Sequence, residues 1–273
     1  MSLDIEENYL GVESSVTGKR WVSRVKDERL AKALSQKFEI HDALARVLAA
    51  RDIGIDDANL FLNPTIRSSL PDPSHLLDMD LAIERIIKAI NDGETIGILG
   101  DYDVDGATSS SLLVRFFGHL GQSVPVYIPD RQKEGYGPNL PALLKLKEKG
   151  ASLIITVDCG TTAYSVLEEA AENDIDIIVI DHHVGEPRLP GGALVINPNR
   201  ADEVSPCKQL AAVGVAFLLV VGINRALRMQ NWFEEGHEEL DLISLLDLVA
   251  LGTICDVVPL IGLIIFVLIL MII

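Results

Sequence analysis

The chain has 273 residues, of which 48% are hydrophobic and 23% are charged. This composition excludes a disordered or fibrous protein, and the chain is long enough to bury a core. Acidic residues outnumber basic ones by 40 to 23, and the part after residue 150 holds only 5 basic residues against 17 acidic ones. A net charge of −17 argues against nucleic-acid binding by a broad basic surface, although it leaves room for a local basic groove or for carboxylates that hold cations.

Three cysteines, Cys159, Cys207 and Cys255, stand far apart and form no CxxC motif. A disulfide framework or a structural zinc site is therefore not expected, and a reducing, cytoplasmic location is favoured. The acidic start of the chain predicts no signal peptide.

Residues 1–75 are expected to form a small helical lobe followed by a connector. Apolar residues recur there at helical spacing: Leu30, Leu34, Phe38, Leu44, Val47 and Leu48. The prolines at 64, 71 and 73 indicate the connector.

Residues 76–260 alternate short apolar runs with helical segments. Strands are predicted at 95–100, 124–128, 153–157, 176–180 and 193–197, and helices at 78–92, 107–120, 139–149, 163–173, 209–229 and 240–252. Nearly continuous runs of β-branched residues separated by helices predict an α/β domain, in which a parallel five-stranded sheet is flanked by helices on both faces.

Polar residues follow three of these strands. The first strand is followed by Asp101, Asp103 and Asp105, the third by Asp158, and the fourth by Asp181, His182 and His183. Ligands of parallel sheets bind at the carboxyl ends of the strands, so these side chains should converge. Crowded carboxylates repel one another unless a divalent cation lies between them, and carboxylate with imidazole suits Mn²⁺ or Mg²⁺, and also Zn²⁺ or Fe²⁺.

Each residue also has a simpler interpretation, since an aspartate at a strand end commonly caps the next helix and a single histidine is more often structural than a ligand. Two other motifs compete for the first strand end. The run from Asp101 to Gly106 copies the first half of an EF-hand loop, but the twelfth position is Leu112 instead of glutamate. The same run is similar to the DxDGT signature of haloacid-dehalogenase-type phosphatases, in which Asp103 would be a nucleophile; this is the alternative enzyme.

Four motifs together resemble the DHH phosphoesterase superfamily: GDYDVDGATS (100–109), VDCG (157–160), DHH (181–183) and GTICDVVPL (252–260). The further runs IPDRQKEGYG (128–137) and INPNRAD (196–202) resemble the bacterial members of that superfamily that degrade single-stranded DNA from the 5′ end. The resemblance covers about residues 20–260. It implies a metal-dependent phosphodiesterase with two Mn²⁺ (or Mg²⁺) ions, acting in DNA repair and recombination.

The resemblance also implies roles for single residues. The metal ligands would be Asp103, Asp105, Asp158, His182 and Asp256, with Asp158 bridging the two ions. Asp101 would be a ligand or a neighbouring carboxylate, Asp181 would orient a ligand, and His183 would contact the scissile phosphate and act as an acid. Without the resemblance, Asp256 reads as a carboxylate at a helix end.

Substrate contacts are predicted beyond the second and fifth strands. Arg131 and Lys133 lie beside Tyr136 and Gly137, where cations could pair with phosphates and the aromatic ring could stack on a base. An ordinary solvated loop is the alternative. Asn197, Asn199 and Arg200 follow the fifth strand and are weaker candidates. The implied partners are single-stranded DNA, a single-strand-binding protein and a RecQ-type helicase.

The uncharged run from Val257 to Ile273 allows a membrane span, a buried element or a foreign tail. We expect residues 261–273 to be an apolar tail produced by truncation or a reading-frame change, with no stable membrane association. The DHHA1 and OB-fold domains that the resemblance implies further along are expected to be absent. The alternatives to the nuclease are therefore another DHH enzyme, acting on short oligonucleotides, cyclic dinucleotides or pyrophosphate, and an inactive metal-binding fragment.

Overall fold

The computed structural model describes residues 8–63, 65 and 70–260 of the chain. The chain forms two compact units, Met1–Ser69 and Leu70–Ile273. The division falls slightly before the boundary at residue 75 that the sequence suggested, and the functional assignment of the two parts stays a prediction. The predicted tail at 261–273 lies outside the described residues.

The first unit is built from short helices. Its elements are η1 (Tyr9–Gly11), α1 (Glu28–Phe38), α2 (Asp42–Ala50) and α3 (Ala58–Leu62). Asp27 begins α1 by accepting hydrogen bonds from the backbone of the first turn. Leu34 and Leu48 are fully buried in the small core between the helices. Leu44 and Val47, in contrast, are exposed, so only part of the expected apolar stripe of α2 faces this core.

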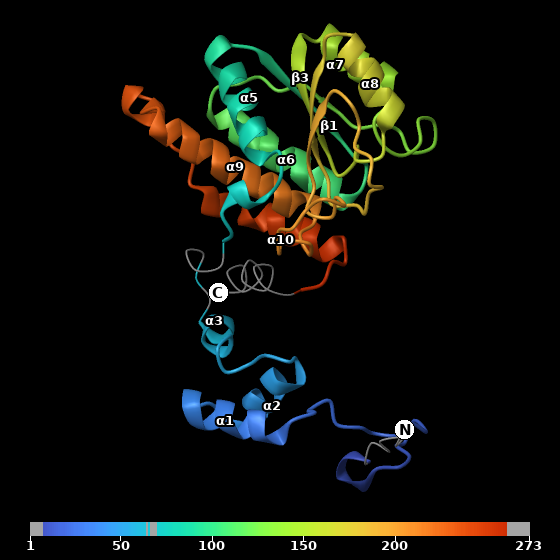
Figure 1. Cartoon of the computed structure of the whole chain (residues 1–273), viewed down its shortest axis with the longest axis vertical. Coiled ribbons are helices and arrows are strands. Elements are labelled where there is room, and N and C mark those ends of the chain that lie inside the picture. The colour runs from blue at the N-terminus through green and yellow to red at the C-terminus, as the bar shows by residue number, and fades with distance from the viewer. Residues whose placement is uncertain (1–7, 64, 66–69, 261–273) are drawn as a thin grey trace. The chain divides into compact units, whose positions relative to one another are not determined.

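The second unit contains the predicted sheet (Figure 1). Its strands are β1 (Thr95–Gly100), β2 (Val126–Tyr127), β3 (Ala151–Val157), β4 (Asp176–Ile180) and β5 (Ala193–Ile196). All neighbours pair in parallel, in the order β2-β1-β3-β4-β5. The carboxyl ends of β1, β3 and β4 therefore lie side by side at one edge.

Helices cover both faces of the sheet (Figure 1). They are α5 (Met79–Asp92), α6 (Val104–His119), α7 (Leu140–Glu148), α8 (Tyr164–Glu172), α9 (Ala212–Met229) and α10 (Leu246–Cys255), with the short turns η2 (Pro73–His75), η3 (Trp232–Glu235) and η4 (Leu242–Leu245). Helices α5, α6 and α9 pack on one face and α7 and α8 on the other, while α10 packs against α6 and α9. The chain thus has the predicted α/β class.

Helix α9 is the central helix of its layer. Its length and composition would allow it to cross a membrane, but 72% of it is buried inside the protein. Phe217, Leu218 and Leu219 are all in the core, between α5, α6 and the sheet. Burial against these neighbours explains its apolar sequence.

An ion-pair network holds the amino ends of the strands. Glu94, just before β1, accepts hydrogen bonds from Arg85 on α5 at 2.6 Å and from Ser152 on β3 at 2.6 Å. Arg85 also donates to Asp176 at the start of β4, at 2.7 Å. The hydrogen bonds and the charge of Arg85 lower the pKa of Glu94 to about 2.

Replacing Glu94 by glutamine should lower the free energy of unfolding at pH 7 by about 1–2 kcal/mol, because charge-assisted hydrogen bonds are lost. Since the folded pKa lies below the unfolded one, Glu94 stabilises the fold fully above about pH 5, and this contribution is lost as the pH falls toward 2. Urea unfolding of wild type and Glu94→Gln at pH 7 and pH 3 should show a smaller difference at pH 3. Glu172→Gln, at an exposed position on α8, is the control; a difference that does not change with pH would contradict the prediction.

Candidate metal centre

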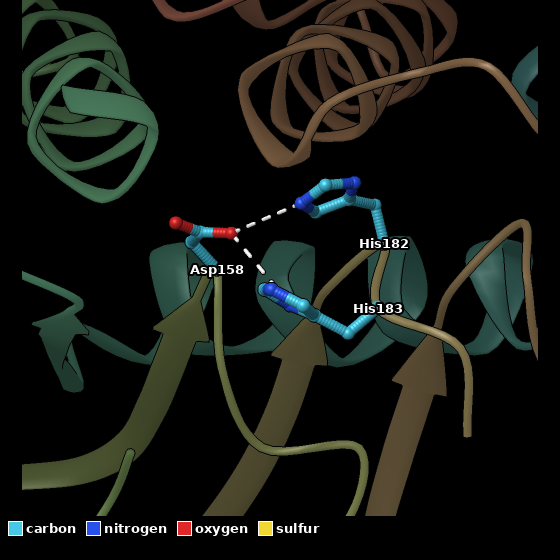
Figure 2. A group of neighbouring side chains, drawn as sticks. All are labelled: Asp158, His182 and His183. Atoms are coloured by element: carbon cyan, nitrogen blue, oxygen red, sulfur yellow. Dashed lines mark ion pairs between the residues drawn. The ribbon is translucent and has the colours of Figure 1, made fainter. Parts of the chain in front are cut away.

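The side chains predicted to converge do meet at the carboxyl edge of the sheet. Asp158 follows β3, while His182 and His183 follow β4, and Figure 2 shows both imidazoles directed at the Asp158 carboxylate. Asp256 reaches the same place from the carboxyl end of α10. With Asp105, which comes from the start of α6 after β1, four separate segments of the second unit contribute to one cluster.

His182 lies among three carboxylates. Its Nε2 is 3.3 Å from Asp158 Oδ1, 3.6 Å from Asp256 Oδ2 and 3.8 Å from Asp105 Oδ2. Its side chain is only 11% exposed. Both His182 Nε2 and Asp158 Oδ1 are buried and have no hydrogen-bond partner among the described residues. Buried polar atoms without partners are rare, and here two of them lie close together, as ligands around an ion would.

A second group of ligand atoms adjoins the first. Asp101, Asp103 and Asp158 each place one carboxylate oxygen within 4.8 Å of the others. Asp101 Oδ1 is buried and has no hydrogen-bond partner in the part of the chain that the structure describes. Asp158 belongs to both groups, which is the position that a carboxylate shared by two ions would need.

The cluster is electrostatically unfavourable by itself. Burial, together with the charges of Asp105 and Asp103, raises the pKa of Asp158 far above its usual value. Burial likewise raises the pKa of Asp105 to about 6 and raises that of Asp256. Divalent cations relieve such repulsion, and oxygen with imidazole ligands suits Mn²⁺ or Mg²⁺. The donor set and its unpartnered atoms therefore fit the predicted two-ion site.

Asp105, which lies on α6, also caps the first turn of another helix, α9. Its Oδ2 accepts a hydrogen bond from Ala212 N at 2.6 Å and its Oδ1 accepts one from Val213 N at 2.9 Å. These are orphan N–H groups in the first turn of α9, whose own N-cap residue, Ala211, offers no side-chain acceptor. The carboxylate of Asp105 therefore connects the metal-ligand cluster to the central helix.

The turn between β1 and α6 is closely packed. Asp103 caps α6 by accepting a hydrogen bond from Gly106 N at 3.0 Å. A Cβ atom at Gly106 would lie 2.5 Å from the carbonyl oxygen of Asp101. Only glycine allows this approach, by which the first turn of α6 packs directly against the backbone of Asp101.

Asp181 and His183 form a pair beside the cluster. His183 Nδ1 lies 2.8 Å from Asp181 Oδ1, and Thr161 N donates to Asp181 Oδ2 at 3.0 Å. Burial alone would raise the pKa of Asp181, but these hydrogen bonds outweigh burial and hold it below its usual value. The hydrogen bond with Asp181 also raises the pKa of His183 to about 9. The side chain of His183 is 48% exposed, so its imidazole lies at the surface of the site.

Of the predicted substrate residues in the loop after β2, Tyr136 contacts the cluster directly and Arg131 lies against its neighbour Tyr102. Tyr136 donates a hydrogen bond from its hydroxyl to the carbonyl of Asp158 at 3.0 Å, and the hydroxyl is 3.3 Å from His183 Nδ1. Its ring meets Tyr102 edge to face, and the Arg131 guanidinium lies 5.1 Å from the Tyr102 ring centre. Tyr102, which sequence reasoning missed, is thus part of an aromatic and cationic group.

The contacts of two other predicted residues of that loop, Lys133 and Gly137, are local to the loop. Lys133 is exposed and pairs with Asp130 at 3.2 Å. Gly137 has a positive φ of 85°, which explains the glycine at this turn.

Asn197 and Arg200 are both buried. Arg200 donates to Asp202, Asp78 and the carbonyl of Val195, so its guanidinium is used within the protein. Asn197 donates to Thr161 and to the carbonyl of His183. These contacts give both residues structural tasks that the sequence did not indicate, and their predicted contact with substrate stays a prediction.

A parallel sheet with carboxylates and imidazoles at its carboxyl edge defines an α/β domain built around a divalent-metal centre. Residues 95–253, more than half of the chain, match the family model described as the DHH family, N-terminal domain. The chain belongs to the DHH family. Leu112, which occupies the twelfth EF-hand position, is fully buried in α6, so the EF-hand is excluded, and the family replaces the haloacid-dehalogenase alternative.

Curated relatives are similar over most of the chain. The single-stranded-DNA-specific exonuclease RecJ of Bacillus subtilis (strain 168) is 40% identical over 242 residues, which cover 88% of this chain and 29% of that protein. Its namesake from Escherichia coli (strain K12) is 39% identical over 224 residues, which cover 81% of this chain and 38% of that protein. The chain therefore spans well under half the length of these relatives.

Solved structures confirm the fold. RecJ from Thermus thermophilus, in complex with Mn²⁺, matches with a TM-score of 0.70 at 28% identity, covering 89% of this chain and 33% of that one. A structure of exonuclease RecJ bound to manganese matches with a TM-score of 0.60 at 34% identity, covering 70% of this chain and 46% of that one. The predicted α/β class with a five-stranded parallel sheet is thus confirmed.

Proposed function

We propose that the chain carries the metal-dependent catalytic part of an exonuclease that hydrolyses single-stranded DNA from the 5′ end. The observation that carries this is the group of unpartnered atoms around His182, Asp158 and Asp101 at the carboxyl edge of the sheet. The relatives that bear the name single-stranded-DNA-specific exonuclease support the substrate. The structures of RecJ with Mn²⁺ and with Mg²⁺ support the metal.

Five side chains would hold two ions, with Asp158 between them and Asp101 as a further carboxylate. The ligands are Asp103, Asp105, Asp158, His182 and Asp256. Divalent ions bound there would supply Lewis acidity toward a phosphoryl oxygen and would lower the pKa of a coordinated water. The scissile phosphodiester would lie beside His183, whose side chain is half exposed next to the Asp158 carboxylate.

His183 suits a role toward the scissile phosphate. Its hydrogen bond with Asp181 raises the pKa of the imidazole and so favours its protonated form. A protonated imidazole offers a positive charge to a phosphate and a proton to a leaving oxygen. Asp181, which is buried, keeps the ring in one orientation.

The single strand would lie along Tyr102, Tyr136 and Arg131. Aromatic rings stack on bases of any sequence, and a neighbouring cation pairs with the backbone phosphates. The cationic group is small, in agreement with the net charge of −17. Lys133 would extend it.

The wider assignment follows from the substrate. Single strands arise where a helicase unwinds duplex DNA, and single-strand-binding protein coats them. We therefore include a RecQ-type helicase and a single-strand-binding protein as partners. We place the activity in DNA repair and recombination. The free thiols of Cys159, Cys207 and Cys255 support a cytoplasmic location. Pull-down of either partner by the full chain would test the partnership.

The test is Mn²⁺-dependent release of nucleotides by the 273-residue chain. The substrate is a 5′-phosphorylated single strand labelled at its 3′ end, with the same strand in a duplex as control. We expect progressive shortening from the 5′ end of the single strand only. Mn²⁺ binding without hydrolysis would favour the inactive metal-binding fragment, and the absence of Mn²⁺ binding would overturn the proposal as a whole.

Tyr136 allows stacking and positioning to be separated. Replacing Tyr136 by phenylalanine keeps the ring and removes the hydrogen bond to Asp158, so kcat should fall about tenfold, equal to about one net hydrogen bond, with KM for DNA unchanged. Replacing it by leucine should also raise KM about tenfold or more, since base stacking is lost. Steady-state kinetics on a single strand measure both constants, and equal effects in the two variants would contradict the stacking role.

A further inference from the structure

The two histidines of the DHH motif lie in a segment without regular secondary structure. Their backbone amides are held by one side chain, because Asp181 Oδ1 accepts hydrogen bonds from His182 N at 2.8 Å and from His183 N at 3.2 Å. The peptide group between His182 and His183 is planar, so its N–H and its carbonyl turn together, and a hydrogen bond at one end alone still lets the group rotate about that bond. The contacts at the two carbonyls therefore also decide where the imidazoles point.

Two asparagines after β5 fix these carbonyls. Asn199 Nδ2 donates to the carbonyl of His182 at 2.6 Å, and Asn197 Nδ2 donates to the carbonyl of His183 at 2.8 Å. All four backbone polar groups of the His182–His183 dipeptide are thus bonded to side chains. Side chains here replace the ladder of hydrogen bonds that a helix or strand would supply.

The chemistry of these contacts requires amides. Asn197 Oδ1 accepts from the backbone N of Asn199 at 2.7 Å, so its nitrogen must face the His183 carbonyl. Asn199 Nδ2 contacts two carbonyls, those of His182 and Lys208, and a carbonyl can only accept. An aspartate has the same shape but no proton to donate, and it would turn an oxygen toward each carbonyl.

Both asparagines also tie the dipeptide to its surroundings. Asn197, which is fully buried, donates to Thr161 Oγ1 at 2.8 Å, and Thr161 N donates in turn to Asp181. Asn199 reaches Lys208, in the loop that leads to α9, whose first turn binds Asp105. The contacts therefore link the dipeptide to the segments that carry its neighbours in the cluster.

We propose that Asn199 and Asn197 are positioning residues, which hold the carbonyls of His182 and His183 so that the His182 imidazole stays directed at Asp158, Asp105 and Asp256. The inference rests on the proposed function, because it assigns His182 to the metal. Groups that orient a metal ligand affect affinity about 10- to 100-fold when they are lost. Neither residue touches the ion or the substrate in this role.

The experiment measures Mn²⁺ affinity of the full chain from the EPR signal of free Mn²⁺, with melting temperatures in EDTA as the measure of folding. Asn199→Ala and Asn199→Asp should raise the Kd for Mn²⁺ about tenfold or more. Asn197→Ala and Asn197→Asp should change it in the same direction, and they decide the question if the first pair does not fold. Asn173, whose amide donates to a carbonyl on α8 away from the cluster, provides the matched controls Asn173→Ala and Asn173→Asp.

A double-mutant cycle separates positioning from a general loss of stability. In a His182→Ala background, Asn199→Ala should have no further effect on Mn²⁺ affinity, because the side chain it positions is gone. An equal effect in both backgrounds, or a folded Asn199→Ala variant that binds Mn²⁺ like wild type, would overturn the inference. If the wild-type chain does not bind Mn²⁺, the proposed function itself fails, and that result is distinct from a wild type that binds and variants that do not differ.

Discussion

Replacing Asp158 by asparagine should lower Mn²⁺-dependent release of nucleotides from single-stranded DNA by at least about a thousandfold, because bound metal supplies several kcal/mol of transition-state stabilisation. Asp158 is the residue that both groups of candidate ligand atoms share. Its loss should therefore affect both ions at once. The rise in melting temperature that Mn²⁺ gives the wild type should also disappear.

Asparagine is the appropriate substitution because of the backbone. Asp158 has a positive φ of 62°, in the left-handed region that asparagine and aspartate tolerate best after glycine. An alanine at this position would add backbone strain to the loss of the carboxylate. In EDTA, Asp158→Asn should melt no lower than wild type, because the amide replaces a buried carboxylate next to Asp103 and Asp105.

Asp174 offers a closely matched control. It is also an aspartate with a positive φ, 52°, but it is exposed and lies between α8 and β4, away from the carboxyl edge. Asp174→Asn makes the same chemical change in the same backbone conformation and should leave both Mn²⁺ binding and turnover unchanged. Asp158→Asn turnover close to that of wild type would refute the assignment of the site.

The sheet could be predicted because its strands are buried on both faces and carry nearly continuous β-branched runs. Strands β1 and β4 begin and end as expected, whereas β2 shrinks from the expected 124–128 to Val126–Tyr127. Pro125 and Pro129 flank this pair, and a proline cannot donate to the ladder of hydrogen bonds. The edge strand is therefore shorter than its apolar run.

The convergence of the strand ends was predictable from topology alone, but three features of the site were not. Asp256 comes from the end of α10 instead of a strand, so only the resemblance placed it among the ligands. Asn197 and Arg200 follow a strand as substrate residues would, yet both are buried, since the strand-end rule does not say which way a side chain turns. Asn199 and Tyr102 gain their importance from contacts with distant segments, which a sequence pattern does not reveal.

Asp105 contacts both the cluster and α9, so we expect its replacement to affect stability as well as metal binding, unlike that of Asp158. Both of its carboxylate oxygens accept hydrogen bonds from the first turn of α9, so an asparagine must turn its NH₂ group toward a backbone N–H. Asp105→Asn should lower the free energy of unfolding in EDTA by about 2–3 kcal/mol, since a buried N–H donor of the first turn of α9 is left unpaired. This corresponds to a fall in melting temperature of roughly 4–12 °C for a unit of this size.

Mn²⁺ affinity should fall as well, because Asp105 Oδ2 lies in the group around His182. Asp241 also accepts a hydrogen bond from a backbone N–H at the start of a helical turn, η4, but it is exposed, so Asp241→Asn controls for the loss of an ordinary cap. Thermal unfolding in EDTA compares the variants. If Asp105→Asn melted like Asp158→Asn, the two carboxylates would differ only as ligands, and α9 would not depend on Asp105 for its first turn.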